Sequence, residues 1–320
     1  MDALLIISYG APEREEDVFP FLHNLFAGKN VPPQRLEYAA EKYRRCAAQS
    51  GSYSPLNGEC LQLIAGVRNE FKRRNQNIPV YWGNLFHEPL LKDTLEQMQR
   101  SGIAEAGIFV TSAFSCNSRY NEALQSVKNI TINLKYLPLP NRNRLFLEAQ
   151  TDTLLTALAH HSLTDYPSSA GSRLVLFSAH SLPKSDPQAA VYAEELQEAC
   201  RSIAELSQEP FDWELVYQSA GVPADRWLEP DIKDRIRSYS RQTAAAGLCR
   251  SVIVSPIGFF CENMETHCDL DIETGQLCGE LALGYCRAAA VGAAPKICRM
   301  IADYCNINPT GQWSLPKIPE

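Results

Sequence analysis

Short apolar runs alternate with longer amphipathic segments along the whole chain. In the first part, β-branched and aromatic runs that are typical of buried strands cover residues 4–9, 78–83, 106–111 and 130–137. Between them, helical periodicity with a charged outer face covers residues 13–26, 57–74, 89–101 and 118–128. The order is strand, then helix, then strand.

The same alternation starts again after residues 137–143, which are rich in Pro and Asn and predict a boundary. We therefore expect an amino-terminal half over residues 1–140 and a carboxy-terminal half over residues 141–320. The second half predicts strands at 173–178, 213–218 and 251–256, and helices near 144–161, 188–206, 230–246, 262–284 and 295–305.

Strands that alternate with helices predict parallel sheets, joined by right-handed crossovers and covered by helices on both faces. The predicted fold class is α/β, with two Rossmann-like halves. In open parallel sheets, ligands bind beyond the carboxyl ends of the strands. The residues that follow each strand are therefore the first candidates for chemistry.

Two strands end in residues of this kind. Ser8-Tyr9-Gly10 follows the first strand, and Ser178-Ala179-His180-Ser181-Leu182-Pro183 ends the strand that opens the second half. Neither is a G-x-G-x-x-G or a P-loop motif, which disfavours dinucleotide and nucleoside triphosphate binding. An imidazole such as that of His180 can accept a proton or hold a divalent metal near neutral pH, although a purely structural histidine is an equal alternative.

A row of carboxylates follows the strand at 251–256. Glu265, Asp269 and Glu273 recur every four residues, so a helical turn stacks them in one row. Oxygen ligands in series suit a divalent cation that moves in or out. The alternative is a solvated acidic face near a helix start.

Composition excludes several classes of protein. The chain has 320 residues, a length typical of about two domains that each have a hydrophobic core. Its apolar fraction of 45% is too high for a disordered chain. It contains no apolar run long enough to span a membrane, and its first ten residues lack the features of a signal peptide. With 30 basic and 37 acidic side chains the net charge is −7, and no basic run predicts a nucleic-acid surface. We expect an intracellular protein.

Cysteine is unusually frequent, with eleven residues, but no pair has C-x-x-C spacing. The favoured interpretation is reduced thiols packed in cores. A redox or metal role, including an iron–sulfur cluster with scattered ligands, stays open. A separate metal site of His267 and Cys268 with Glu265 and Asp269 is disfavoured, because adjacent helical positions point about 100° apart.

Taken together, these segments resemble the ferrochelatase family. The segment 178–183 is similar to the family's histidine signature, and 256–273 to its second active-site segment with the carboxylate row. Further similar segments lie across the whole chain, at residues 9–12, 17–18, 54–56, 218–219 and 227–231. The resemblance implies two Rossmann-like halves with a porphyrin cleft between them.

The resemblance also implies an activity, the insertion of Fe²⁺ into a free-base porphyrin in haem biosynthesis, with release of two protons. His180 and Glu265 would be the catalytic pair, and both would contact the metal. Asp269 and Glu273 would continue a polar path for metal ions or protons. Iron would be a substrate, no organic cofactor is implied, and an iron–sulfur cluster is not expected.

The similarity is greatest to the short bacterial ferrochelatases that use coproporphyrin III, in which a tyrosine follows the first strand as Tyr9 does here. Protoporphyrin IX is the alternative substrate. Coproporphyrin carries four propionates, and the residues expected to bind it are Tyr9, Ser54, Tyr120, Lys29 and Trp227, with Arg44 and Arg45 as further donors. Phe26 and Ala27 stand where similar proteins carry arginines.

Two other functions remain as alternatives. One is a chelatase for a sirohydrochlorin-type ring, and the other is a non-catalytic haem carrier, which would not need the acidic row. We expect a cytoplasmic monomer without a stable membrane anchor, whose partners are the porphyrin and Fe²⁺.

Overall fold

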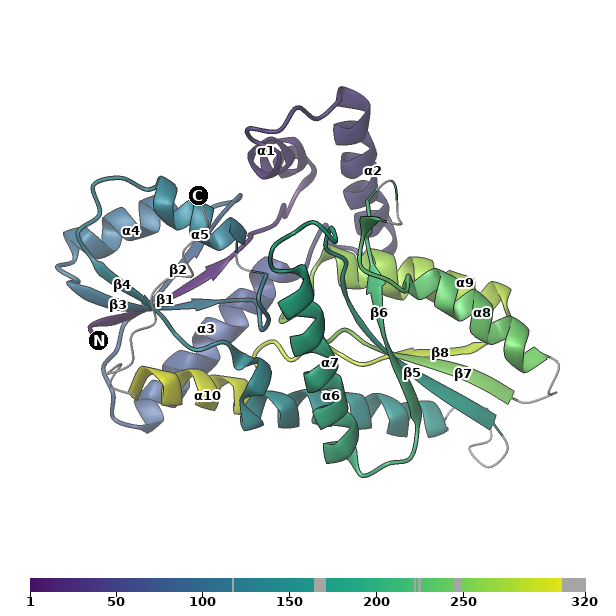
Figure 1. The fold of residues 1–320 in the computed structure, drawn as a ribbon. Helices are drawn as coiled ribbons and strands as arrows, with labels where there is room; N and C mark the ends of the chain where they lie inside the picture. The colour runs from purple at the N-terminus through teal and green to yellow at the C-terminus, as the bar shows by residue number, and fades with distance from the viewer. Residues whose placement is uncertain (117, 164–170, 222, 224–225, 245–248, 307–320) are drawn as a thin grey trace.

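The computed structural model describes the chain except for residues 117, 164–170, 222, 224–225, 245–248 and 307–320. Its described part contains two parallel four-stranded sheets, each flanked by helices (Figure 1). The predicted fold class is therefore confirmed.

The first sheet has the strand order β2-β1-β3-β4. Its strands are β1 (Ala3–Ser8), β2 (Val80–Asn84), β3 (Glu105–Val110) and β4 (Asn133–Tyr136). The helices between them are α1 (Glu15–Leu25), α2 (Pro33–Ser50), α3 (Leu56–Arg73), α4 (Leu91–Arg100) and α5 (Ser118–Ser126).

The second sheet has the order β6-β5-β7-β8. Its strands are β5 (Gly171–His180), β6 (Asp212–Gln218), β7 (Cys249–Ser255) and β8 (Gly284–Arg287). The accompanying elements are α6 (Arg144–Leu163), α7 (Ala189–Ser207), α8 (Ile232–Ala244), the π-helix η3 (Thr266–Thr274), α9 (Gly275–Glu280) and α10 (Pro295–Asn306). A 3₁₀ turn, η1 (Pro140–Arg142), lies in the predicted boundary segment.

Side-chain alternation along the central strands decides which helices cover which face. In β5, Val175 and Phe177 belong to a large core that includes α7 and also reaches β1, whereas Leu174 and Leu176 pack with α8, η3 and α9. His180 shares the parity of Leu174 and Leu176. The strand register therefore directs His180 toward the side of the sheet on which η3 lies.

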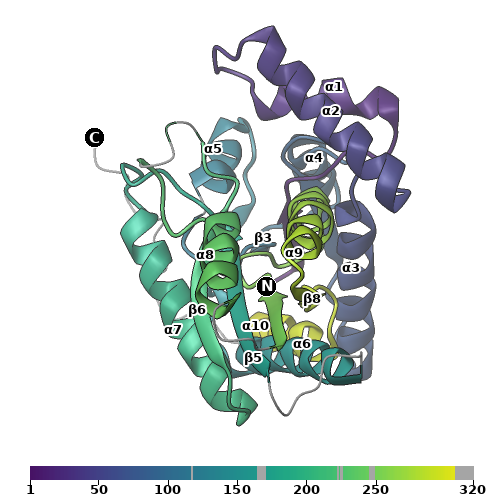
Figure 2. The same ribbon diagram turned by 90° about the vertical axis from the view of Figure 1, so that its right-hand side faces the viewer.

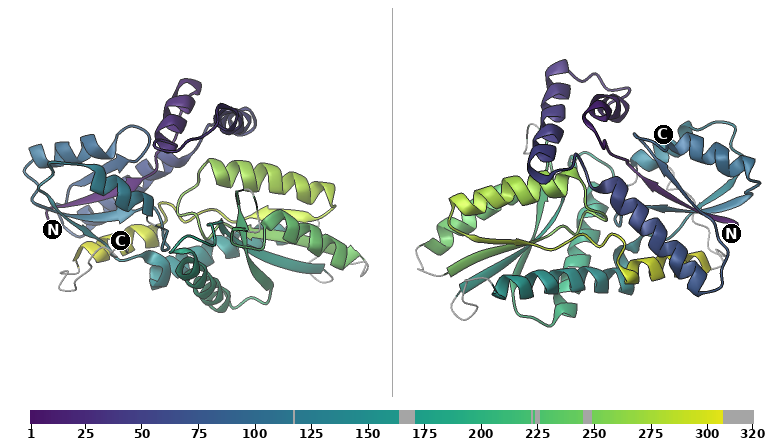
Figure 3. Two further views of the ribbon diagram at one scale, coloured as in Figure 1. Left: turned by 45° about the horizontal axis from the view of Figure 1, so that its top comes forward. Right: turned by 180° about the vertical axis from the view of Figure 1, so that it is seen from behind.

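Two helices, α10 and α2, contact elements that belong to different sheets. The helix α10 comes last in the described chain, yet it packs against α3, which belongs to the first sheet, and against α6 (Figures 2 and 3). Near the top of Figure 1, α1 and α2 form an arm, and α2 packs against η3. The division into halves at residue 140 stays a prediction.

The sequence pattern missed two elements. The helix α2, which buries Ala40, Tyr43 and Cys46, was not predicted. The edge strand β8 has only four residues, and only Gly284 of these is buried. The expected helical segment at 262–284 is confirmed in part, because it divides into η3 and α9 and is followed by β8.

Candidate active site

His180 ends β5, with its ring half-buried. Its Nδ1 lies 2.6 Å from the carbonyl oxygen of Ser181, and because a carbonyl only accepts, Nδ1 is the protonated nitrogen. In the neutral imidazole Nε2 then carries the lone pair, and it lies 3.5 Å from Oε1 of Glu265. The Tyr192 hydroxyl donates to the carbonyl of His180 at 3.1 Å and fixes the strand end.

Gly258 lets the segment after β7 approach β5 closely. A Cβ at this position would lie 2.5 Å from Cβ of Ala179, and the Gly258 N–H donates to the carbonyl of Ser178 at 3.0 Å. Only a glycine permits this contact without displacement. The contact brings the segment that carries Glu265 beside His180.

We expect Gly258→Ala to lower the free energy of unfolding by about 1–3 kcal/mol, because the added methyl overpacks a close backbone contact. Urea unfolding measures this. The matched control is Gly279→Ala in α9, where a Cβ meets no atom within 4 Å and should stabilise the helix by about 0.5–1 kcal/mol. Equal stability of the two variants would contradict the close-contact interpretation.

Local hydrogen bonds start the helical turn that carries Glu265. The Asn263 N–H donates to Oγ1 of Thr266, and the Thr266 N–H donates to Oδ1 of Asn263, each at 3.0 Å. This reciprocal pair satisfies amide groups that lack partners at a helix start. Glu265 lies between these two residues, directly before η3.

Arg287 of β8 clamps the same segment from its other side. Its guanidinium donates to both carboxylate oxygens of Asp271, at 2.6 and 2.9 Å, and to Oε1 of Glu262 at 2.8 Å. Burial raises the pKa of Glu262, but the charge of Arg287 outweighs it, and the net pKa lies below its ordinary value. Glu262 is therefore a carboxylate at neutral pH.

The other two carboxylates of the row are paired with cations from α2 and α8. Asp269 contacts Nζ of Lys42 and accepts a hydrogen bond from Ser219 at 2.5 Å. Glu273 contacts Arg45 and Lys233. Burial raises the pKa of Glu273, yet the cations around it lower the net pKa below its usual range. Asp269 and Glu273 are therefore paired with cations and do not form a free acidic face.

Cys268 adds a thiol to this row. Its Sγ and one oxygen each of Asp269 and Glu273 all lie within 4.8 Å of one another. The thiol of Cys268 therefore lies close to a carboxylate oxygen of Asp269, although adjacent helical positions were expected to point about 100° apart. Interaction with the thiol of Cys46, together with Arg45 and Lys42, lowers the pKa of Cys268 below its usual value against the effect of burial.

Tyr9 lies just beyond the carboxyl end of β1, in edge-to-face contact with Tyr120 and Phe86 at ring-centroid distances of 5.3 and 5.4 Å. Burial raises the pKa of Tyr9 well above its usual value, with further contributions from Cys116 and Glu265. The phenol is therefore protonated at neutral pH.

Comparisons with known proteins agree with this arrangement. A family model described as Ferrochelatase matches residues 1–308. The chain belongs to the ferrochelatase family. It is 36% identical to the ferrochelatase of Rhodopirellula baltica, over 94% of this chain and 84% of the relative. It is also 36% and 33% identical to the coproporphyrin III ferrochelatases of Frankia alni and Mycolicibacterium smegmatis, over 95% and 94% of this chain and 79% and 88% of theirs.

A solved structure, SirB from Bacillus subtilis with Fe³⁺, matches with a TM-score of 0.52 and 12% identity, over 95% of this chain and 93% of that one. This likeness concerns the fold alone. As a ferrochelatase, the protein inserts Fe²⁺ into a porphyrin, a step of haem biosynthesis. No described helix has the length and apolar character needed to cross a membrane.

The predicted site residues fall into three groups in this ferrochelatase. His180 and Glu265 face each other, and Tyr9 packs against the buried Tyr120 beyond the carboxyl end of β1. Ser54 is buried before α3, where its Oγ accepts from the Leu56 N–H at 3.4 Å. Lys29 is exposed between α1 and α2, and Trp227 is half-buried in a bridge with Pro183. The binding roles of all these residues stay predictions.

The two further arginines are not free to act as donors. Arg44 bonds Glu15, Glu37 and Glu41, and Arg45 contacts Glu273. Two of these partners, Glu15 and Glu273, are far from Arg44 and Arg45 along the chain, so nothing in the sequence indicated them, whereas Glu37 and Glu41 precede Arg44 on α2 itself. The same applies to Lys42 and Arg287, whose neighbours in sequence carry no motif, whereas Ser219 lies in the segment 218–219 that resembles the family.

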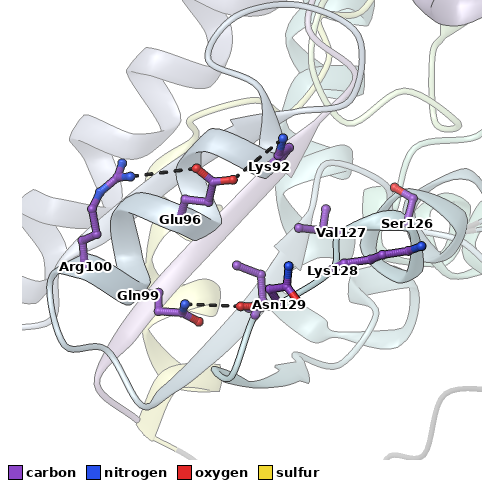
Figure 4. Close-up of a pocket in the computed structure, with 9 residues that line it drawn as sticks. Lys92, Glu96, Gln99, Arg100, Ser126, Val127, Lys128 and Asn129 are labelled. Carbon is purple, nitrogen blue, oxygen red and sulfur yellow. Dashed lines mark hydrogen bonds and ion pairs between the residues drawn. The ribbon is translucent and has the colours of Figure 1, made fainter.

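A pocket at another end of the molecule is unrelated to this site. Figure 4 shows its lining, which comes from α4 and from the segment between α5 and β4. The helix α4 leads into the amino end of β3, and the segment after α5 leads into the amino end of β4. His180 and Tyr9 lie instead at the carboxyl ends of their strands. Its carboxylate, Glu96, already lies 3.9 Å from the cationic nitrogens of Lys92 and Arg100.

Proposed function

We propose that this ferrochelatase inserts Fe²⁺ into coproporphyrin III, and that His180 and Glu265 carry the chemistry. The observation behind the assignment is the pair of facing acceptors, the lone pair of Nε2 and the carboxylate oxygen, 3.5 Å apart. Two acceptors without a donor between them suit a divalent cation or protons leaving a pyrrole nitrogen.

The proposed reaction uses the pair as follows. A planar porphyrin holds its nitrogen lone pairs in the ring plane, so a bound, distorted ring exposes one nitrogen to the metal. Binding energy spent on that distortion stabilises the transition state more than the ground state. His180 Nε2 takes up a pyrrole proton or ligates iron, and Glu265 supplies the negative charge that stabilises either species.

Asp269 and Glu273 are proposed to pass Fe²⁺ or protons toward Glu265. In the resting structure their charges are balanced by Lys42, Arg45 and Lys233. A cation on this path would therefore displace ammonium or guanidinium groups from the carboxylates. Such an exchange costs less than burying an unpaired charge, because the carboxylates always keep a counter-ion.

The preference for coproporphyrin III rests on the named relatives and on charges near Tyr9. Coproporphyrin III ferrochelatases of Frankia alni and Mycolicibacterium smegmatis are among the similar proteins. Partial desolvation lowers the pKa of the otherwise exposed Lys29, and the positive charges of Arg119 and Arg35 lower it further. Neither Lys29 nor Arg119 forms an ion pair with any residue that the structure describes, so both are suited to bind propionates.

An anaerobic insertion assay with Fe²⁺ and each of the two porphyrins tests the proposal. We expect kcat/KM for coproporphyrin III to exceed that for protoporphyrin IX at least tenfold, which corresponds to about 1.4 kcal/mol. Lys29→Met should raise KM for coproporphyrin III, with little change in kcat. The matched control is Lys128→Met, in the unrelated pocket of Figure 4.

A higher kcat/KM for protoporphyrin IX would reject the substrate assignment. Tight binding of iron porphyrin without any insertion would favour a carrier instead. We also propose that the protein holds no iron–sulfur cluster, on the ground that its cysteines lack ligand spacing. An absorption spectrum of protein purified without oxygen checks that proposal.

A further inference from the structure

The helix α7 contacts both the strand end that carries His180 and a segment from the first part of the chain. Tyr192 and Glu195 lie three positions apart in α7, so their side chains leave the helix on nearly the same face. The Tyr192 hydroxyl donates to the carbonyl of His180. Glu195 binds Ser115, which lies shortly after β3. One face of α7 thus joins the two parts of the chain.

Both carboxylate oxygens of Glu195 accept hydrogen bonds from Ser115. The Ser115 N–H donates to Oε2 at 2.7 Å, and the Ser115 hydroxyl donates to Oε1 at 2.8 Å. Hydrogen bonds to a charged acceptor are short and about twice as strong as neutral ones. The carboxylate is half-buried, so water competes with these bonds less than it does on an open surface. The two bonds therefore fix both the position and the orientation of Ser115 against α7.

Ser115 belongs to the segment that leads from β3 toward α5, which we call the β3–α5 segment (residues 111–116). The helix α5 that follows carries Tyr120, one of the residues expected to bind the porphyrin. Within the segment, Phe114 lies edge-to-face against Tyr192, with ring centroids 6.3 Å apart. Two adjacent residues of the β3–α5 segment therefore contact α7, one through an apolar ring and one through hydrogen bonds.

We propose that Glu195 is a positioning residue for iron insertion, which holds the β3–α5 segment at a fixed distance from the strand end that carries His180. The inference rests on the proposed function, in which Tyr120 and His180 contact the same porphyrin. Less than one helical turn separates Glu195 from Tyr192, so the rigid backbone of α7 connects the two contacts. Glu195 acts through Ser115 and not on a reacting atom.

A fixed spacing matters because the reaction needs a distorted ring. If the two sides of the porphyrin site move apart, the ring binds in its planar form, and binding energy stabilises the ground state as much as the transition state. If the spacing is held, the same binding energy favours the distorted ring. Loss of the Glu195–Ser115 contact should therefore lower kcat, while KM for the porphyrin stays the same or falls.

The test uses the full-length enzyme with Fe²⁺ and each of the two porphyrins under anaerobic conditions. Glu195→Ala should lower kcat about 10- to 100-fold, the effect expected of a displacement of about 1 Å, without raising KM. The rate is counted per porphyrin-binding site, measured by fluorescence quenching, so that unfolded protein does not contribute. The out-of-plane ring modes in the resonance Raman spectrum of the bound porphyrin should weaken in the same variant.

Glu195→Gln should recover most of the rate and of the Raman intensity. Its amide oxygen still accepts from the Ser115 N–H, and its amide nitrogen can donate to the Ser115 hydroxyl. Ser115→Ala removes only the bond at 2.8 Å and should show a smaller loss of kcat in the same direction. Because this variant keeps the backbone bond, it decides the question if Glu195→Ala does not fold.

The matched control is Glu198→Ala, which removes a carboxylate of the same helix. Glu198 pairs with Arg142, whose side chain is 73% exposed and which lies outside the β3–α5 segment. This variant should keep normal kcat, KM and Raman intensity.

Normal kcat in Glu195→Ala and Ser115→Ala, or a loss of kcat with unchanged Raman modes, would overturn the proposal. An unaltered enzyme that inserts iron into neither porphyrin would instead count against the proposed function. The Raman comparison would then still test the contact, because it needs a bound ring and no turnover.

Discussion

Replacing His180 with alanine is expected to lower kcat for Fe²⁺ insertion by roughly 10²–10⁴-fold, the usual contribution of a positioned proton acceptor. The variant removes the Nε2 lone pair that faces Glu265 and leaves the backbone of β5 intact. Single-turnover absorption changes of the porphyrin under anaerobic conditions measure the rate. Quenching of porphyrin fluorescence should show that binding is retained.

The matched control is His160→Ala, because His160 is exposed on α6 and contacts no part of the site. It should insert iron at the normal rate. If His180→Ala turns over within threefold of the unaltered enzyme, His180 is neither the proton acceptor nor an essential ligand. A loss confined to porphyrin binding would make it a substrate contact only.

Arg287→Met is expected to lower the free energy of unfolding by about 3–5 kcal/mol, because it leaves the carboxylates of Glu262 and Asp271 without their counter-ion. Urea unfolding at neutral pH measures the loss. The double variant Arg287→Met/Glu262→Gln should recover part of it, since the buried charge is then removed together with its partner. Arg237→Met, at an exposed pair with Asp234, should cost less than about 1 kcal/mol.

The same clamp predicts a dependence on pH. The pKa of Glu262 in the folded state lies below its unfolded value of about 4.3. Its contribution to stability is therefore complete above that unfolded pKa and is lost as the pH falls through the lower folded pKa. The difference between the unaltered enzyme and Glu262→Gln should be constant near neutral pH and shrink in acid. A difference that grew in acid would contradict the assigned ion pair.

Strand periodicity was sufficient to predict the fold class, because buried parallel strands need continuous apolar runs. The same rule placed His180 and Tyr9 beyond strand ends, where parallel sheets bind ligands. It did not reveal α2, which buries Ala40, Tyr43 and Cys46. Nor could it show that a helix from the first part of the chain would supply Lys42 and Arg45 to the acidic row.

The carboxylates illustrate the same limit. A spacing of four residues correctly placed Glu265, Asp269 and Glu273 on one helical segment. The ion pairs that two of these carboxylates form with lysine and arginine depend on contacts between distant segments, which the spacing does not reveal. One position, Gly258, left only a weak sign in the sequence as a glycine shortly after a strand. The reason for a glycine at this position, the close approach of its backbone to Ala179, is visible only in the three-dimensional structure.

The return of α10 to α3 has a consequence for how the protein is made. Residues Leu63, Ile64 and Val67 of α3 share a buried core with Ile297 and Ile301 of α10. More than two hundred residues separate the two helices in the sequence, so during synthesis the apolar face of α3 lacks its partner until α10 has left the ribosome. A nascent chain released before α10 would expose that face to chaperones and proteases.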